Sequence, residues 1–385
     1  MDFALTEEQL AVSEAATGLF AGLVDPEKIA AIEVSEDRID RDLWKALASA
    51  DLLGLAVPEA DGGAGYGLME LCLLLEAQGN AVAPVPLWPT LVLGAHPLAH
   101  FGSEAQRARW LPGVVAGDVI LTAALNGTAA SPTSMPSVHA GVSGDGWILN
   151  GTELAVPQAH LADRIVLPAR TDDGGVLLVL LDPAASGVTL ERAVTTNREI
   201  HPHLHVADVA VASDDVLVGP ASGVAAGRAA LDSLLVAATI ALCALQVGVC
   251  EAALTKTAAY LNGRNQFGRP LSTFQATLLR AADAAIDIEA MRVTWQNAAW
   301  RFDTGRASAD AARAAKWQAS ERGQRAVHAT QHLHGGMGAD ISYPIHRYFL
   351  WGKQVELLLG GPSAQLSKLG ADIAEQALAR AGAAS

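Results

Sequence analysis

Apolar residues recur every three or four positions at both ends of the chain and gather in short runs in its middle. Over residues 41–53, Leu43, Leu47, Ala50 and Leu53 fall on one helical face. In the last third, long Ala- and Leu-rich stretches predict helices at 224–262, 271–304, 308–333 and 345–380. Both ends of the chain are therefore predicted to be helical.

The middle of the chain follows a different pattern. Short aliphatic runs at 147–149, 164–168, 176–181 and 206–211 are separated by turn residues such as Asn150-Gly151 and Asp182-Pro183. Short runs bounded by turns are typical of strands. We therefore predict an α+β chain with a helical domain at 1–117, a β domain at 118–218 and a helical bundle at 219–385.

Composition supports a folded protein and excludes several partners. Of 385 residues, 51% are hydrophobic, and 26 Lys and Arg against 41 Asp and Glu give a net charge of −15. An acidic surface repels phosphate backbones and anionic lipid, which argues against nucleic-acid and membrane-surface binding. The chain has three cysteines, Cys72, Cys243 and Cys250, an odd number that does not form a disulfide framework.

One stretch is apolar enough to raise the question of a membrane span. Residues 233–250 form a stretch of 18 residues without a charge. A length of about 18 residues is the lower limit for a helix that crosses a bilayer. The stretch is rich in alanine and contains Thr239, Gln246 and Gly248, so a helix buried in a protein bundle suits it better. The acidic N-terminus does not resemble a signal peptide. We expect a cytoplasmic protein without a membrane segment.

Two segments in the last third carry candidate chemistry. The first is RNQFGRPLSTFQ (residues 264–275), in which Gly268 and Pro270 separate two helices and Arg264 offers a planar set of donors for a phosphate or carboxylate. A plain helix-to-helix loop explains the segment equally well. The second is HLHGGMG (332–338), a glycine turn after a helix whose backbone N–H groups could approach a ligand closely.

Together these segments resemble the acyl-CoA dehydrogenase family of flavoenzymes. The resemblance spans the chain and includes FALTEEQL (3–10), PEADGGAGYG (58–67), GWILNGT (146–152) and HLHGGMGADISYPIHRY (332–348). It implies a helical N-terminal domain, a middle β-barrel, a C-terminal four-helix bundle and FAD as cofactor. It also implies that a set of residues contacts the FAD of a neighbouring subunit. These residues are Arg264, Phe267, Gln275, Gly335, Gly336 and His332, which stands where the family usually has Gln.

The catalytic base of the family is missing. The reaction implied by the resemblance removes an α-proton from an acyl-CoA, so it needs a positioned carboxylate. The family places this Glu in one of two positions, which correspond here to Gly360 and Ala238. A shift in register does not restore the second position, because no Glu occurs between Glu199 and Glu251.

The positions that would bind the chain's own flavin have changed as well. The family's Thr-Glu and Gly-Ser motif is replaced by residues 123–128, AALNGT. Its Trp-Ile-Thr-like stretch is replaced by Ala155-Val156-Pro157, and proline has neither an N–H nor a hydroxyl. Residues for a neighbour's FAD are thus kept, while those for the chain's own FAD and base are lost.

This split predicts one subunit of an α2β2 acyl-CoA dehydrogenase. A homologous partner would supply the Glu and the acyl-CoA pocket, and reduced flavin would pass electrons to an electron-transfer acceptor. The pattern resembles the bacterial heteromeric enzymes that act on steroid side-chain CoA thioesters. Two alternatives remain open: an autonomous enzyme that uses Glu356, one helical turn before Gly360, or a scaffold subunit that binds no cofactor.

Other features have simpler explanations. His201, His203 and His205 alternate as on a strand and could in principle ligate Zn²⁺, but Pro202 and Leu204 between them favour an ordinary surface strand. The glycines between Asp61 and Gly65 follow no strand, so they are not predicted to cradle a phosphate. We predict no metal site.

Overall fold

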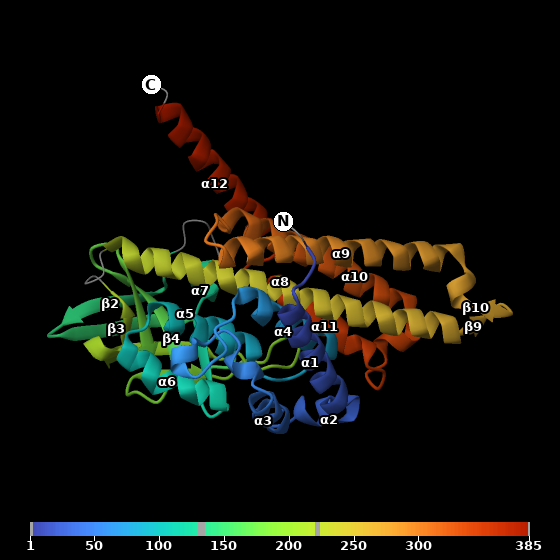
Figure 1. Ribbon diagram of the computed structural model, residues 1–385, viewed down its shortest axis with the longest axis horizontal. Helices are drawn as coiled ribbons and strands as arrows, with labels where there is room; N and C mark the ends of the chain where they lie inside the picture. Colours follow the sequence, from blue (N-terminus) through green and yellow to red (C-terminus); the bar gives the residue numbers. More distant parts are fainter. Residues whose placement is uncertain (1–2, 130–134, 220–223, 384–385) are drawn as a thin grey trace.

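Figure 1 shows a computed structural model that describes residues 3–129, 135–219 and 224–383. The N-terminal part is helical, as predicted, and Thr6 begins its first helix with a capping box to Gln9. Its elements are α1 (Glu7–Leu23), α2 (Pro26–Ile32), α3 (Arg41–Ser49), α4 (Leu68–Ala81), the π-helical segment η3 (Trp88–Ala95), α5 (His96–Phe101) and α6 (Glu104–Ala116), with short 3₁₀ turns at Leu52–Gly54 and Glu59–Asp61.

The middle part forms one mixed sheet in the order β6-β7-β3-β2-β4-β5-β8, with β1 paired in parallel to β4. Among the described strands, β6 and β8 lie at the two edges and do not pair, so the barrel implied by the resemblance is open. The strands are β1 (Leu121–Ala123), β2 (Val138–Ser143), β3 (Gly146–Glu153), β4 (Arg164–Thr171), β5 (Val176–Leu181), β6 (Val188–Glu191), β7 (His203–Val211) and β8 (Val216–Val218), and α7 (Asn126–Ala129) follows β1.

Both faces of this sheet are covered near β5. Leu178 and Leu180 pack into the large core shared with the helices, while Leu177 and Val179 pack into a separate core on the other face. Because successive side chains of a strand point to opposite faces, a strand buried on both sides needs an unbroken apolar run. This explains why β5 is aliphatic at all of its positions.

The C-terminal part is a bundle of α8–α11, and α12 extends away from it (Figure 1). The long helix α8 lies against α4, β5 and the other bundle helices. The elements are α8 (Val224–Gly263), β9 (Asn265–Gln266), β10 (Arg269–Pro270), the 3₁₀ turn η6 (Leu271–Thr273), α9 (Gln275–Asp303), α10 (Ala309–Leu333), the 3₁₀ turn η7 (Gly335–Ala339), α11 (Ile345–Leu357) and α12 (Pro362–Ala383).

The single helix expected over 345–380 is in fact two helices. Leu359 and Gly360 both have positive φ, 57° and 95°, which an α-helix cannot accommodate. Pro362 then starts α12, where its missing N–H is not needed. Helical periodicity on both sides of the break hid it in the sequence.

Of the described helices, α8 alone is long and apolar enough to cross a membrane, and 78% of its apolar window is buried inside the protein. The helix is covered on several sides by protein because it contacts the N-terminal helices, the sheet and the bundle. This burial accounts for the uncharged stretch at 233–250.

Glycines allow α4 and α8 to approach closely. A Cβ on Gly248 would lie 1.9 Å from the Glu76 carbonyl oxygen, and one on Gly79 would lie 2.2 Å from that of Leu245. We expect Gly248→Ala to lower the free energy of unfolding by about 1–3 kcal/mol, because the two helices must separate. Urea denaturation measures this change.

Gly18→Ala on α1 is the matched control, since a Cβ there meets nothing within 4 Å. Alanine is the better helix former, so this variant should be unchanged or more stable by up to about 1 kcal/mol. Equal effects of the two substitutions would contradict the close-packing explanation.

Candidate cofactor half-site

The first candidate segment forms a tight hairpin between α8 and α9. Strands β9 and β10 pair antiparallel, with Gln266 opposite Arg269. Phe267 and Gly268 make the turn, with φ of 54° and 79°, as a two-residue hairpin turn requires. Phe267 is 91% exposed. The hairpin thus presents a large apolar side chain to the outside of the chain.

Arg264 precedes this hairpin in a fixed backbone position. Its N–H donates to the Tyr260 carbonyl, and its own carbonyl accepts from Leu271 N–H, both at 2.9 Å. The side chain is exposed, and no acidic residue in the described part of the chain pairs with its guanidinium. Its donors are therefore free for a ligand outside the chain. Gln275, at the start of α9, is also exposed.

The second candidate segment is the glycine turn at the end of α10. Gly335 has φ of 56° directly after the cap residue His334, the usual way in which a helix ends. Gly335 and Gly336 are exposed, and a Cβ on either would meet nothing within 4 Å. His332, one residue before the end of α10, is exposed as well. The turn thus presents open backbone to the outside.

A buried aromatic contact joins the two segments. The Tyr260 ring stacks on the His334 ring at 4.5 Å, and the Tyr260 hydroxyl donates to the His334 carbonyl at 3.4 Å. The Tyr343 ring lies 5.3 Å from His334. His334 Nδ1 lies 2.8 Å from the Thr330 carbonyl, which only accepts, so this nitrogen carries the proton. Burial also lowers the pKa of His334.

The contact between Tyr260 and His334 was not predicted from the sequence. The available signals were weak: Tyr260 stands one helical turn before Arg264, and His334 stands directly before the glycine pair. Arg264, Phe267, Gln275, His332, Gly335 and Gly336 are all exposed around this contact. We call this exposed set the half-site, because it forms no enclosed pocket within one chain.

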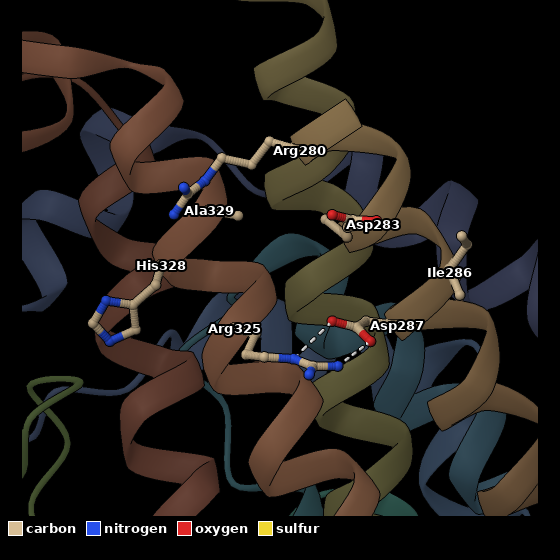
Figure 2. Close-up of a pocket in the computed structure, with 8 residues that line it drawn as sticks. Arg280, Asp283, Ile286, Asp287, Arg325, His328 and Ala329 are labelled. Carbon is tan, nitrogen blue, oxygen red and sulfur yellow. Dashed lines mark hydrogen bonds and ion pairs between the residues drawn. The ribbon is translucent and has the colours of Figure 1, made fainter. Parts of the chain in front are cut away.

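A groove of about 550 Å³ continues from the half-site between α9 and α10 (Figure 2). Asp287 lies in it and accepts from Arg325 Nε at 3.1 Å and from Arg322 at 2.6 Å. Arg280 reaches from α9 toward Ala329 on α10. Asp283 also lines the groove, so its two arginines, Arg280 and Arg325, face two carboxylates, Asp283 and Asp287.

The turn after β1 is occupied by the chain's own groups. Gly127 N–H donates to the Glu153 carboxylate at 3.2 Å, and the Ser137 hydroxyl donates to the same carboxylate at 2.5 Å. Burial raises the pKa of Glu153. The Asn126 amide donates to the Ala155 carbonyl at 2.8 Å. These three contacts are internal, whereas the buried Thr128 hydroxyl of the same turn has no hydrogen-bond partner in the described chain.

The neighbouring stretch 155–157 is also tied down. Val156 is buried, and its N–H donates to the Pro202 carbonyl at 2.8 Å. The Pro157 carbonyl accepts from the Thr122 hydroxyl at 2.7 Å. The Ala155 N–H donates to His203 Nδ1 at 3.0 Å. This stretch has no free donor for a cofactor.

The family comparisons agree with these observations. The model of the acyl-CoA dehydrogenase N-terminal domain matches residues 6–118, and that of the C-terminal domain matches residues 226–374. "Acyl-CoA dehydrogenase FadE27" of Mycobacterium tuberculosis is 36% identical over 97% of this chain and 99% of its own length. This chain belongs to the acyl-CoA dehydrogenase family.

Two solved structures of family members are similar over nearly the whole chain. A variant of the "Tcur3481-Tcur3483 steroid ACAD" has a TM-score of 0.90 at 46% identity. The "ChsE4-ChsE5 complex from Mycobacterium tuberculosis" has a TM-score of 0.89 at 36% identity. Each alignment covers 97% of this chain and 99% of the other. The resemblance found in the sequence, its fold and its FAD cofactor are confirmed at the level of the family.

The two positions predicted to correspond to the family's catalytic Glu, Gly360 and Ala238, carry no carboxylate. Gly360 lies in the link between α11 and α12, with φ of 95°. Ala238 is fully buried in α8, and its carbonyl accepts from Trp88 Nε1 at 3.2 Å. Trp88 is itself buried in η3 and covers this position.

A cavity of about 330 Å³ remains beside these positions, between α8, α10 and α12. Val236 and Thr239 line it from α8, and Leu359 lines it from the link. Charged groups of α12 close it: Lys368 donates to the Ala129 carbonyl, and Asp372 pairs with Arg313 on α10. These contacts engage Lys368 and Asp372, whereas Glu375 of α12 also lines the cavity and makes no ion pair with a described residue.

Glu356, the alternative base, is engaged elsewhere. Its side chain is buried, and its carboxylate lies 2.5 Å from Lys353 Nζ in an ion pair along α11. It lines neither this cavity nor the groove at Arg280. A base must reach its substrate directly or through one water, so the position does not favour the autonomous enzyme.

We therefore expect Glu356→Gln to leave the turnover of the assembled enzyme within about twofold of the parent, because the carboxylate is paired away from the cavity. Reduction of an electron acceptor by the co-expressed complex with an acyl-CoA measures this. A loss of a hundredfold or more, the usual contribution of a general base, would restore the interpretation in which Glu356 is catalytic.

The three alternating histidines do not converge on one point. His205 lies between the Thr152 hydroxyl and Glu191, and His203 accepts from Ala155 N–H. His201 is buried beside Glu199 at 3.2 Å. In the described residues no three His, Cys, Asp or Glu side chains are arranged to hold a metal ion.

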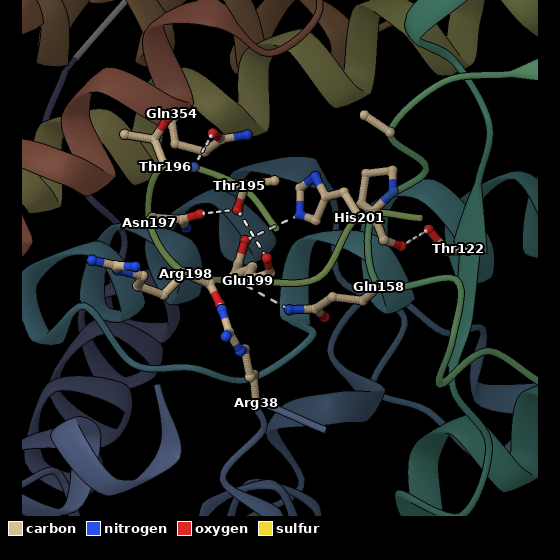
Figure 3. A network of polar contacts seen from close by, with 12 residues as sticks. Arg38, Thr122, Gln158, Thr195, Thr196, Asn197, Arg198, Glu199, His201 and Gln354 are labelled. Atoms are coloured by element: carbon tan, nitrogen blue, oxygen red, sulfur yellow. Dashed lines mark hydrogen bonds and ion pairs between the residues drawn. The ribbon is translucent and has the colours of Figure 1, made fainter. Parts of the chain in front are cut away.

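Glu199 and His201 instead belong to a network at a domain boundary (Figure 3). Gln158 donates to Glu199 at 3.2 Å. Arg38 of the N-terminal part donates to the Arg198 carbonyl at 2.7 Å. The adjoining loop contacts α11 through Gln354, which accepts from Thr196 N–H at 3.3 Å. The network joins the sheet to both helical parts, which gives these residues a structural role.

Proposed function

We propose that this chain is the subunit of a heteromeric acyl-CoA dehydrogenase that contacts the FAD of a Glu-bearing partner. The observation that carries the proposal is an asymmetry. All six residues of the half-site are present and exposed, whereas the residues at both predicted base positions lack a carboxylate. One chain therefore offers ligands for a cofactor but not the base that the reaction needs.

The half-site fits FAD held by another subunit. Arg264 suits the pyrophosphate, because a guanidinium offers paired donors to phosphate oxygens. The open glycine turn at Gly335 and Gly336 lets a ligand contact the backbone. When bound, FAD would accept a hydride from the substrate. The chain's own turn offers fewer groups to a second FAD, since Gly127 N–H and the Asn126 amide already donate to Glu153 and Ala155.

The similar structures support the finer parts of this proposal. Each of the two similar structures is named after two proteins. The Tcur3481-Tcur3483 protein is called a steroid ACAD, and ChsE4-ChsE5 is called a complex. We propose an α2β2 assembly in which each FAD lies between unlike subunits. Its substrate would be a steroid side-chain CoA thioester, its electrons would pass to an electron-transfer acceptor, and it would work in the cytoplasm.

The test is the visible flavin absorbance of this chain, purified alone and with a co-expressed Glu-bearing homologue. We expect colour only in the mixture, at one flavin for each pair of unlike subunits, because each subunit supplies half of the site. Stoichiometric FAD on this chain alone would overturn the proposal.

A further inference from the structure

A second pocket, of about 540 Å³, lies at the other end of α9. It is formed by the start of α4, by α5, and by the last turn of α9. The length of α9 separates it from the half-site by about 42 Å. We infer that this α4–α9 pocket binds a small organic cation, a guanidinium or an alkylammonium. This goes beyond the proposed function and does not depend on it.

Two carboxylates line the pocket without a basic partner. Glu70 and Asp303 make no ion pair with a described residue, and neither Lys nor Arg lines the pocket. Asp303 accepts from Leu68 N–H and Met69 N–H, each at 2.9 Å. Each oxygen of Asp303 thus has one donor and retains capacity for another.

The Glu70 carboxylate is held in the same way. One oxygen accepts from Gly67 N–H at 2.9 Å, and the other accepts from the Gln9 amide at 3.0 Å. Burial in the same region raises the pKa of Asp303, to which the charge of Glu70 also contributes. Glu70 is buried and Asp303 is exposed, and neither has an ion-pair partner in the described chain, so both can accept from a ligand that brings positive charge and N–H donors.

His96 is an independent sign of a ligand. Its side chain is 5% exposed and lines the pocket, but neither ring nitrogen hydrogen-bonds to a described residue. The ring nitrogens are not enclosed by protein, so water or a ligand in the pocket can hydrogen-bond to them. His100 lies next to it, with ring centroids 4.1 Å apart. Its Nδ1 donates to the His96 carbonyl at 2.9 Å, so its Nε2 remains an acceptor when the ring is neutral.

Aromatic rings complete the lining. Tyr66, Trp300 and Phe302 line the pocket, and the Phe302 ring lies 5.6 Å from that of His96. One face of Trp300 is already covered by the Arg306 guanidinium, which leaves Tyr66 and Phe302 as the free aromatic walls. The faces of aromatic rings attract cations, particularly organic ones. Acceptors together with aromatic faces are the chemistry that recognises an amine or a guanidinium.

A metal ion fits less well than an organic cation. No group of three His, Cys, Asp or Glu in the described ranges is placed to hold a metal. The pocket volume is also that of a small-molecule site rather than of a single ion.

The test is isothermal titration of the full chain, alone and assembled with its partner, with agmatine, which carries both a guanidinium and an amine. Glutarate and a neutral alcohol of similar length are the control ligands. We expect agmatine alone to bind, and Glu70→Gln to weaken its binding by about tenfold, through loss of one charge-assisted contact. Flavin content of the complex should stay unchanged, which separates this result from the proposed function.

Two further variants keep the test decisive. Tyr66→Ala removes an aromatic wall that is 40% exposed, and it should weaken binding even if Glu70→Gln disturbs α4. Glu7→Gln removes one carboxylate from exposed α1 and should have no effect. The inference is overturned if millimolar agmatine does not bind, if Glu7→Gln weakens binding equally, or if Tyr66→Ala leaves it unchanged. The inference is also overturned if agmatine binds the free chain but not the complex. In that case a basic side chain of the partner would occupy the pocket in the assembled enzyme.

Discussion

Arg264→Ala is expected to weaken FAD binding by the co-expressed complex by about 10- to 100-fold, because a charge-assisted hydrogen bond contributes roughly 1.5–3 kcal/mol. The backbone of Arg264 is held by Tyr260 and Leu271, so the hairpin should keep its shape. The Arg264 guanidinium is exposed and free of acidic partners in the described chain. The measurement is flavin content after dialysis, together with the FAD concentration that restores activity.

Arg306→Ala is the control for this experiment. Arg306 is an exposed arginine that stacks on Trp300 at the opposite end of α9, with its guanidinium 4.7 Å from the ring centroid. Its removal should leave flavin content unchanged. If Arg264→Ala also leaves flavin content unchanged, the half-site does not hold FAD, and the chain is better described as a cofactor-free scaffold.

The stability of the chain is expected to fall as the pH drops from about 6.5 to 3 because of His96. Burial lowers the pKa of this imidazole from 6.5 to about 3, and the neighbouring His100 acts in the same direction. Between these values the unfolded chain binds a proton that the folded chain excludes. Acid therefore favours unfolding, by about 5 kcal/mol at most over the whole window.

Urea denaturation from pH 7 to pH 4 measures this effect, with His96→Gln as the test. Glutamine does not titrate, so the variant should lose less stability on acidification than the parent, by up to about 1.4 kcal/mol per pH unit. The same change at the exposed His332 is the control and should leave the parent slope in place. Parallel slopes for the parent and His96→Gln would refute the assignment.

Much of the fold could be predicted because its signals are local. Helical periodicity marked α9 and α10 to within a few residues, and the aliphatic run of β5 was recovered at both ends. The break between α11 and α12 was missed, because it depends on two positive φ angles inside a periodic stretch. Backbone angles of this kind leave little trace in hydrophobic pattern.

The candidate site divides in the same way. The sequence by itself determined the family, the motifs at Arg264 and Gly335, and the absence of Glu from positions 238 and 360, since these are properties of residue identity. Only the tertiary structure showed that Tyr260 stacks on His334, and that Lys353 pairs with Glu356. It alone brought Glu70 to Asp303 in the α4–α9 pocket. Such contacts join residues distant along the chain, and their partners are chosen by packing, which no local pattern records.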